Sequence, residues 1–225
     1  MRSKEGRIDF EPAFRSMDAI EAFHVGAVGS VATSYDAGGE LHGPGEIFLD
    51  RCEAAVLIDE AYYEFCGISA LDMLAQHPNL FVSRTFSKVY GMAAMRLGCL
   101  FSQAGNIAFL HKAQSPYSVN ALAALAAQEA VRDTAYVENY VTEALAAREL
   151  LCVGLEKLGI EYVPSQGNFV LMRVGKRSIE IRDKLREKQV LVRDRSYEIA
   201  GCVRVTIGTR EQTRRFLDEL GKIWR

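Results

Sequence analysis

The sequence lacks the features that define several large functional classes. Among its 225 residues no apolar run approaches the length of a membrane span, and the opening MRSKEGRIDFEPAF has no apolar core like that of a signal peptide. A formal net charge of -2 provides no excess of positive charge for nucleic acid or an anionic membrane surface. These absences predict a cytoplasmic protein that binds neither membranes nor nucleic acids.

Metal sites, disulfides and nucleotide-binding loops are not indicated either. The four histidines have no i, i+4 spacing and the five cysteines form no Cys-x-x-Cys pair. We therefore expect no metal and reduced, mostly buried thiols. A Val-Leu-Ile-Asp-Glu string is also typical of the Walker B strand, but its companion G-x-x-x-x-G-K-[ST] is missing.

The first half of the chain alternates short apolar runs with helical patterns. Strands are expected at 25–31, 54–58, 80–83 and 97–102, and near-continuous apolar strands separated by helices are typical of a mostly parallel sheet covered on both faces.

The second half begins with Ala-rich sequence. It predicts two helices between residues 118 and 158, broken near Asp133, with Ser118 or Asn120 as the first cap and Gly159 as the last. Strands at 168–174, 190–193 and 202–207 and helices at 179–188 and 211–223 follow. We place the domain boundary near residue 118.

The segment 84–98, RTFSKVYGMAAMRLG, is the most informative part of the chain. It places Lys88 among hydroxyls and ahead of Arg96, between two expected strands. Upstream, Asp59 ends another apolar strand and Tyr62 follows three positions later. An amine, an isolated acid, a phenol and an anion-binding arginine are the groups needed to hold and use pyridoxal phosphate.

These segments resemble those of a known family. DEAYYEF, RTFSKVYGMAAMRLG, PYSVN, GNFVL and CVRVTIGT resemble, in the same order, segments of fold-type I pyridoxal-phosphate enzymes of the class I/II aminotransferase group. Within that group the likeness is greatest to histidinol-phosphate aminotransferases, from about Ala54 to the C-terminus. The resemblance implies an α/β type I transferase fold. Residues 1–118 would be a truncated remnant of the large, mostly parallel cofactor-binding domain, and residues 119–225 the interdomain helices and a small C-terminal α/β domain.

The resemblance also implies roles for matching residues. Lys88 would carry the cofactor covalently and then act as the general base. Asp59 would pair with the pyridinium nitrogen, and Tyr62 would donate to the cofactor's phenolic oxygen. Thr85, Ser87 and Arg96 are expected to hold the phosphate.

Two residues of the second half are expected to meet the substrate. By the same resemblance, Arg204 would bind the substrate α-carboxylate, and Asn168 would lie near it. The implied reaction transfers an amino group from histidinol phosphate to 2-oxoglutarate, in histidine biosynthesis, by a homodimer in the cytoplasm.

The chain departs from the family's pattern at its N-terminal end. Only 58 residues precede Asp59, and Asp36 stands roughly where the family has an asparagine that contacts the cofactor. Two alternatives remain open: a truncated, non-catalytic remnant with weak cofactor affinity, and an enzyme like threonine-phosphate decarboxylase.

Overall fold

The computed structural model describes residues 55–224 and, for the backbone alone, residues 24–26. Asp36 and most of the expected strand at 25–31 lie outside the described residues. The chain divides into two compact units, Met1–Thr134 and Ala135–Arg225. The division comes later than the boundary expected near residue 118 and leaves the first Ala-rich helix with the first unit. No helix in residues 55–224 is both long and apolar enough to cross a membrane.

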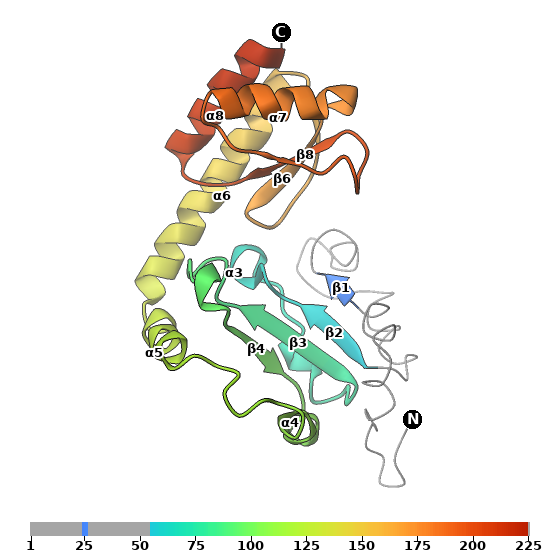
Figure 1. Cartoon of the computed structure of the whole chain (residues 1–225), viewed down its shortest axis with the longest axis vertical. Helices are drawn as coiled ribbons and strands as arrows, with labels where there is room; N and C mark the ends of the chain where they lie inside the picture. The colour runs from blue at the N-terminus through green and yellow to red at the C-terminus, as the bar shows by residue number, and fades with distance from the viewer. Residues whose placement is uncertain (1–23, 27–54, 225) are drawn as a thin grey trace. The chain divides into compact units, whose positions relative to one another are not determined.

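Unit 1 is built on a four-stranded sheet of order β1-β2-β3-β4 (Figure 1). β1, β2 and β3 are parallel, and β4 is antiparallel to β3. The mostly parallel α/β sheet expected from the apolar runs is thereby confirmed. The elements in chain order are β1 (His24–Gly26), β2 (Val56–Asp59), α3 (Tyr63–Cys66), η3 (Leu71–Met73), β3 (Leu80–Thr85), η4 (Ala93–Met95), β4 (Gly98–Phe101), α4 (Ala104–His111) and α5 (Ala121–Ala130).

The core of unit 1 lies on one face of β2 and β3. Alternate side chains of a strand point to opposite faces, so Val56 and Ile58 face one way while Leu57 and Asp59 face the other. Val56 and Ile58 pack with Leu80 and Val82 of β3 against the segment around η3, which contributes Ala70, Leu71, Met73 and Leu74. This burial leaves the opposite face at the strand ends for polar side chains.

β4 is fixed closely against β3 at one position. Gly98 pairs with Thr85, and a Cβ placed on Gly98 would lie 2.8 Å from the carbonyl oxygen of Arg84. Only glycine fits there without a backbone shift. All four residues of β4 are exposed, so the expectation of a buried thiol is wrong for Cys99.

The two Ala-rich helices are where the sequence predicts them. α5 begins after Asn120, whose Oδ1 accepts from the backbone N–H of Leu122 (2.8 Å) and of Ala123 (3.3 Å). The second helix, α6 (Thr134–Lys157), is followed by Gly159 with φ of 68°. A φ in the left-handed region costs glycine little, so the predicted C-terminal stop is confirmed.

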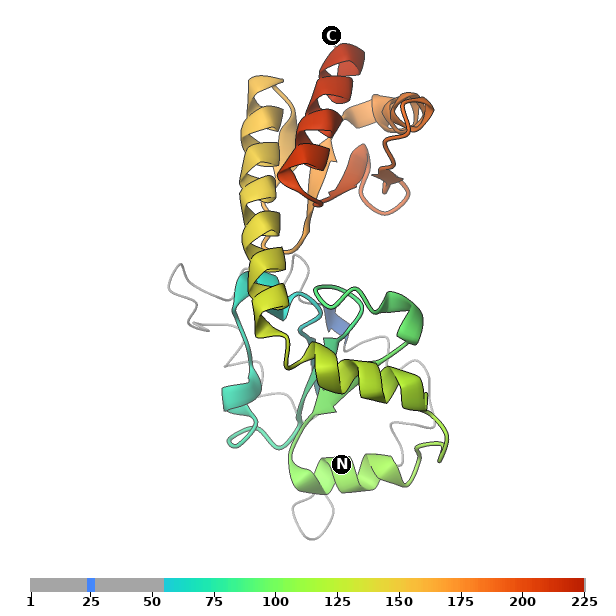
Figure 2. The ribbon, with the colours of Figure 1, turned by 90° about the vertical axis from the view of Figure 1, so that its left-hand side faces the viewer.

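Unit 2 has a four-stranded antiparallel sheet of order β5-β6-β8-β7. α6 and α8 run side by side (Figures 1 and 2), and the Glu143 carboxylate on α6 accepts from the first backbone N–H of α8, that of Arg210 (2.7 Å). The short strand β5 was not expected from the sequence. The remaining elements are β5 (Glu161–Val163), β6 (Phe169–Arg173), η5 (Gly175–Arg177), α7 (Ser178–Glu187), β7 (Arg193–Asp194), β8 (Cys202–Thr206) and α8 (Arg210–Trp224).

A core leucine tests this packing in unit 1. Leu80 is fully buried, whereas Leu122 on α5 is 70% exposed. We expect Leu80→Ala to lower the free energy of unfolding by about 2–5 kcal/mol through lost burial and the cavity left behind. Leu122→Ala should change it by less than about 0.5 kcal/mol. Urea denaturation followed by circular dichroism measures both, and equal midpoints would contradict the assignment of the core.

Candidate functional site at the ends of β2 and β3

An acid is held at the carboxyl end of the parallel strands. Asp59 ends β2 and pairs in register with Ser83 of β3. Its Oδ1 accepts from the Ser83 hydroxyl (3.1 Å) and from the backbone N–H of Ala61 (3.1 Å). These bonds fix one carboxylate oxygen of Asp59 at the sheet edge where the chain leaves both strands.

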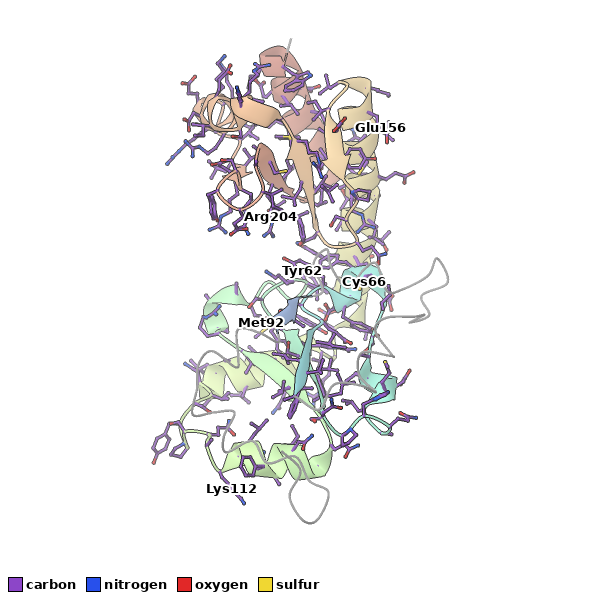
Figure 3. All side chains as sticks on the ribbon, turned by 90° about the vertical axis from the view of Figure 1, so that its right-hand side faces the viewer. Tyr62, Cys66, Met92, Lys112, Glu156 and Arg204 are labelled. Carbon is purple, nitrogen blue, oxygen red and sulfur yellow. The ribbon has the colours of Figure 1, made fainter. Side chains whose placement is uncertain are left out.

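A tyrosine and a lysine meet beside this acid. Tyr62 lies in the turn before α3 (labelled in Figure 3), is 8% exposed and packs near Phe65, with ring centroids 6.4 Å apart. The Lys88 Nζ lies 5.1 Å from the centroid of the Tyr62 ring. Residues that follow two separate strands are thereby brought together.

The loop that carries Lys88 is closed by backbone bonds. The N–H of Phe86 donates to the carbonyl of Leu97 (3.2 Å), and the N–H of Met92 donates to the carbonyl of Phe86 (3.0 Å). The side chains of Phe86 and Val89 are buried, whereas Lys88 between them is half-buried. The loop is thus anchored on both sides of the lysine.

The hydroxyl residues lie at the start of this loop. Thr85 is the last residue of β3, and its Oγ1 accepts from the backbone N–H of Ser87 (3.1 Å). That bond makes a tight turn directly before Lys88. Thr85, Ser87 and Lys88 are therefore adjacent in space as well as in sequence.

Arg96 lies at the far end of the same loop. It is exposed, has φ of 53° and donates from Nη1 to the carbonyl oxygen of Ala93 (2.9 Å). A left-handed backbone is uncommon for a residue other than glycine and is often found at functional positions. The Arg96 guanidinium bonds to its own turn, and the expected contact with a phosphate stays a prediction.

The two expected substrate-binding residues lie in unit 2, one on β8 and one directly before the neighbouring strand β6. Arg204 is on β8 (labelled in Figure 3), and its guanidinium carbon is 4.3 Å from the centroid of the Phe169 ring on β6. Asn168 immediately precedes β6, and its carbonyl accepts from the N–H of Ile207 (2.7 Å). Stacking on Phe169 fixes the plane of the Arg204 guanidinium.

An ion pair between a buried acid and a partly exposed arginine, behind the strand ends, was not predicted. Arg84 Nε donates to Glu60 Oε2 at 2.9 Å, with the Glu60 side chain 3% exposed. Arg84 also donates from Nη2 to the Ser69 hydroxyl (2.9 Å) and stacks 3.5 Å above the centroid of Tyr63. The sequence carried one signal for this pair, because Glu60 and Arg84 each follow an apolar strand segment and are each adjacent to a predicted site residue.

A second acid lies near this pair. Burial raises the pKa of Glu64 above its usual value, and the charge of Glu60 adds to that rise while Arg84 opposes it. Burial likewise raises the pKa of Tyr90, with the Glu64 charge as a further cause. The Arg84 cation therefore interacts electrostatically with two carboxyl groups, those of Glu60 and Glu64.

Comparison with known proteins identifies what the chain is similar to. Residues 46–220 match the family model described as "Aminotransferase class I and II". The chain is 35% identical over 168 residues to "Histidinol-phosphate aminotransferase 1" of Carboxydothermus hydrogenoformans, covering 75% of this chain and 48% of that protein. It therefore spans about half the length of this relative.

Two solved structures have the same fold. The histidinol-phosphate aminotransferase from Clostridium acetobutylicum superposes with a TM-score of 0.76 at 24% identity, covering 99% of this chain and 69% of that one. The histidinol-phosphate aminotransferase from Sinorhizobium meliloti, solved in complex with pyridoxal-5'-phosphate, gives 0.71 at 23% identity, covering 81% and 53%. At these identities the likeness shows the fold.

The raised pKa of Glu64 predicts a pH effect on stability. Between the usual value of 4.5 and the raised value, the folded protein binds more protons than the unfolded chain. The free energy of unfolding therefore falls as the pH rises through this window. Glu64→Gln removes the titration, so we expect the variant to gain stability relative to the native chain between pH 4 and pH 7. Urea denaturation at both pH values checks this, and a stability difference independent of pH would contradict it.

Proposed function

The chain belongs to the class I and II aminotransferase family, and on that premise we propose that it transfers an amino group with pyridoxal phosphate as cofactor. The proposed donor is histidinol phosphate and the proposed acceptor is 2-oxoglutarate, in histidine biosynthesis. The name of the relative at 35% identity supports this choice over a decarboxylase. We further propose, from the resemblance, that the protein acts as a homodimer in the cytoplasm.

One observation carries the proposal: a lysine amine lies 5.1 Å from a buried tyrosine ring, beside an acid that Ser83 and Ala61 hold in place. The chemistry of these groups fits the cofactor. An amine suits its aldehyde, a carboxylate its ring nitrogen, and a phenol its phenolic oxygen. Arginine with hydroxyls suits its phosphate. Lys88, Asp59, Tyr62, Thr85, Ser87 and Arg96 would therefore hold it.

The cofactor, when bound, supplies an electron sink for the bond broken at the substrate Cα. Lys88 Nζ would hold the cofactor covalently and, as a free amine, would take the proton from the substrate Cα as general base. Asp59 would pair with the pyridinium nitrogen. The bonds from Ser83 and Ala61 hold one oxygen of the Asp59 carboxylate in place at the end of β2.

Binding and orientation fall to the remaining residues. Tyr62 would donate its phenolic proton to the cofactor's phenolic oxygen, and burial of its ring limits how far that donor can move. Thr85 and Ser87 would donate hydroxyl protons to the phosphate, and Arg96 would contact it as a cation. We propose that Arg204, oriented by Phe169, binds the substrate α-carboxylate and that Asn168 assists it.

Glutamate formation from 2-oxoglutarate and histidinol phosphate, in the presence of pyridoxal phosphate, tests the reaction. Formation that depends on both substrates and on Lys88 supports the proposal. Cofactor binding without glutamate formation would instead favour a non-catalytic remnant. Carbon dioxide release from threonine phosphate would favour the decarboxylase.

Covalent trapping tests the role of Lys88 directly. After incubation with pyridoxal phosphate and borohydride reduction, we expect peptide mapping to find the label on Lys88 alone. Lys88→Ala should abolish it, because within residues 55–224 the amine that lies against the Tyr62 ring is that of Lys88. The exposed Lys112 serves as the internal control (Figure 3). Label on Lys112 or Lys176 in place of Lys88 would refute the assignment.

A substitution of Arg96 tests the phosphate contact. A charge-assisted hydrogen bond contributes about 1.5–3 kcal/mol, so Arg96→Ala should weaken pyridoxal phosphate binding at least about tenfold. Arg132→Ala is the matched control, since Arg132 is exposed and bonds Glu129 on the surface of the same unit. Absorbance titration gives both dissociation constants. Equal constants for the two variants would show that Arg96 makes no such contact.

A further inference from the structure

The segment that carries Tyr62 is a closed loop. Glu60 Oε1 accepts from the backbone N–H of Ala70 (2.6 Å), and both carboxylate oxygens accept from the Ser69 hydroxyl (2.9 and 3.0 Å). Glu60, the first residue of the segment, thus binds its last two residues, Ser69 and Ala70. Tyr62 and α3 lie within the loop, so their position relative to the end of β2 is set by the Glu60 carboxylate.

Arg84 joins this loop to the strand that leads to Lys88. Three of its contacts, with Glu60, Ser69 and the Tyr63 ring, go to residues of the loop, and its guanidinium carbon also lies 6.0 Å from the centroid of the Phe101 ring on β4. Arg84 itself is the residue before Thr85 on β3, where the Lys88 turn begins. One guanidinium therefore connects the two strand ends that supply the candidate site.

The connection lies on the opposite side of the sheet from the acid. Successive side chains of a strand point to opposite faces, so Arg84 points away from the face on which Ser83 holds Asp59. The Glu60 backbone N–H still bonds the Ser83 carbonyl (2.8 Å), which keeps the loop in register with β3 up to that residue. The ion pair can set the spacing of Asp59, Tyr62 and Lys88 without touching a ligand.

We propose that Glu60 and Arg84 are a positioning pair that holds Tyr62 and Lys88 at the separation needed to bind the cofactor. This inference rests on the proposed function for the identity of the ligand. A buried ion pair contributes little net stability, because desolvation of the charges offsets their attraction. Its geometric effect is larger, since the planar guanidinium fixes a donor direction and a stacking plane that a lysine cannot reproduce.

Three variants test the pair in the full chain. Arg84→Lys keeps the charge but loses the forked geometry, and Glu60→Gln removes the charge at nearly constant shape. Ser69→Ala removes the hydroxyl that bonds Glu60, Arg84 and the backbone N–H of Leu71 but keeps both charges of the ion pair, so it provides a variant without a change of charge. Glu129→Gln, on an exposed ion pair of the same unit, is the matched control for loss of an acidic charge.

The first measurement is the dissociation constant for pyridoxal phosphate, at a temperature where circular dichroism shows each variant folded. Loss of a hydrogen bond to a charged group generally lowers binding affinity about tenfold or more. We therefore expect Arg84→Lys and Glu60→Gln to weaken binding at least about fivefold, with Ser69→Ala intermediate and Glu129→Gln unchanged. A purely structural role predicts native affinity in every folded variant, and that result would overturn the proposal.

The second measurement needs no cofactor. The rate of acetylation of Lys88 relative to Lys112, followed by mass spectrometry, reports the surroundings of the Lys88 amine. We expect this ratio to change in Arg84→Lys and Ser69→Ala but not in Glu129→Gln. If the native chain takes no borohydride-fixed label at Lys88, the proposed function fails while this ratio still decides the positioning role. A ratio equal to that of the native chain in both variants would refute it.

Discussion

The Glu60 carboxylate bonds a backbone amide, a hydroxyl and a guanidinium while its side chain is 3% exposed. In a low-dielectric setting such bonds are strong, and a group left without its partners is costly. The geometry of the loop from Glu60 to Ala70 and of the end of β3 must therefore satisfy this one acid. The sheet register and the burial of Tyr62 are consistent with that single arrangement, and it supports the residues that give the site its chemistry.

The parts of the site that could be predicted are those that follow from strand ends. Asp59 and Ser83 each end an apolar run, and the carboxyl ends of parallel strands meet at one edge of a sheet, so their proximity needed only the strand assignment. The Arg84 contacts could not be predicted in this way, because they depend on a single-residue register between segments far apart in the sequence. Periodicity identifies the face on which a charge lies but does not identify its partner across a turn.

The fold could be predicted from the sequence to about the same extent as the site. Long helices with caps at Asn120 and Gly159 give strong local signals, because capping satisfies backbone groups whatever the tertiary context. The four-residue helix α3 and the three-residue strand β5 have too few residues to show a period. Their positions are set by tertiary contacts, such as the closed loop around Tyr62. The first compact unit also extends past the expected boundary, since α5 buries Ala123 and Ala127 rather than standing apart as a linker.

Gly98 shows how a residue without a side chain can limit which sequences this site tolerates. The space for a Cβ at this position is taken by the Arg84 carbonyl. Any replacement must therefore move the backbone of the residue whose guanidinium holds the loop around Tyr62. A change on β4 would thus be transmitted through β3 to both strand ends. A side chain at position 98 is therefore incompatible with this backbone, whereas Leu100 on the same strand directs an exposed side chain away from the core.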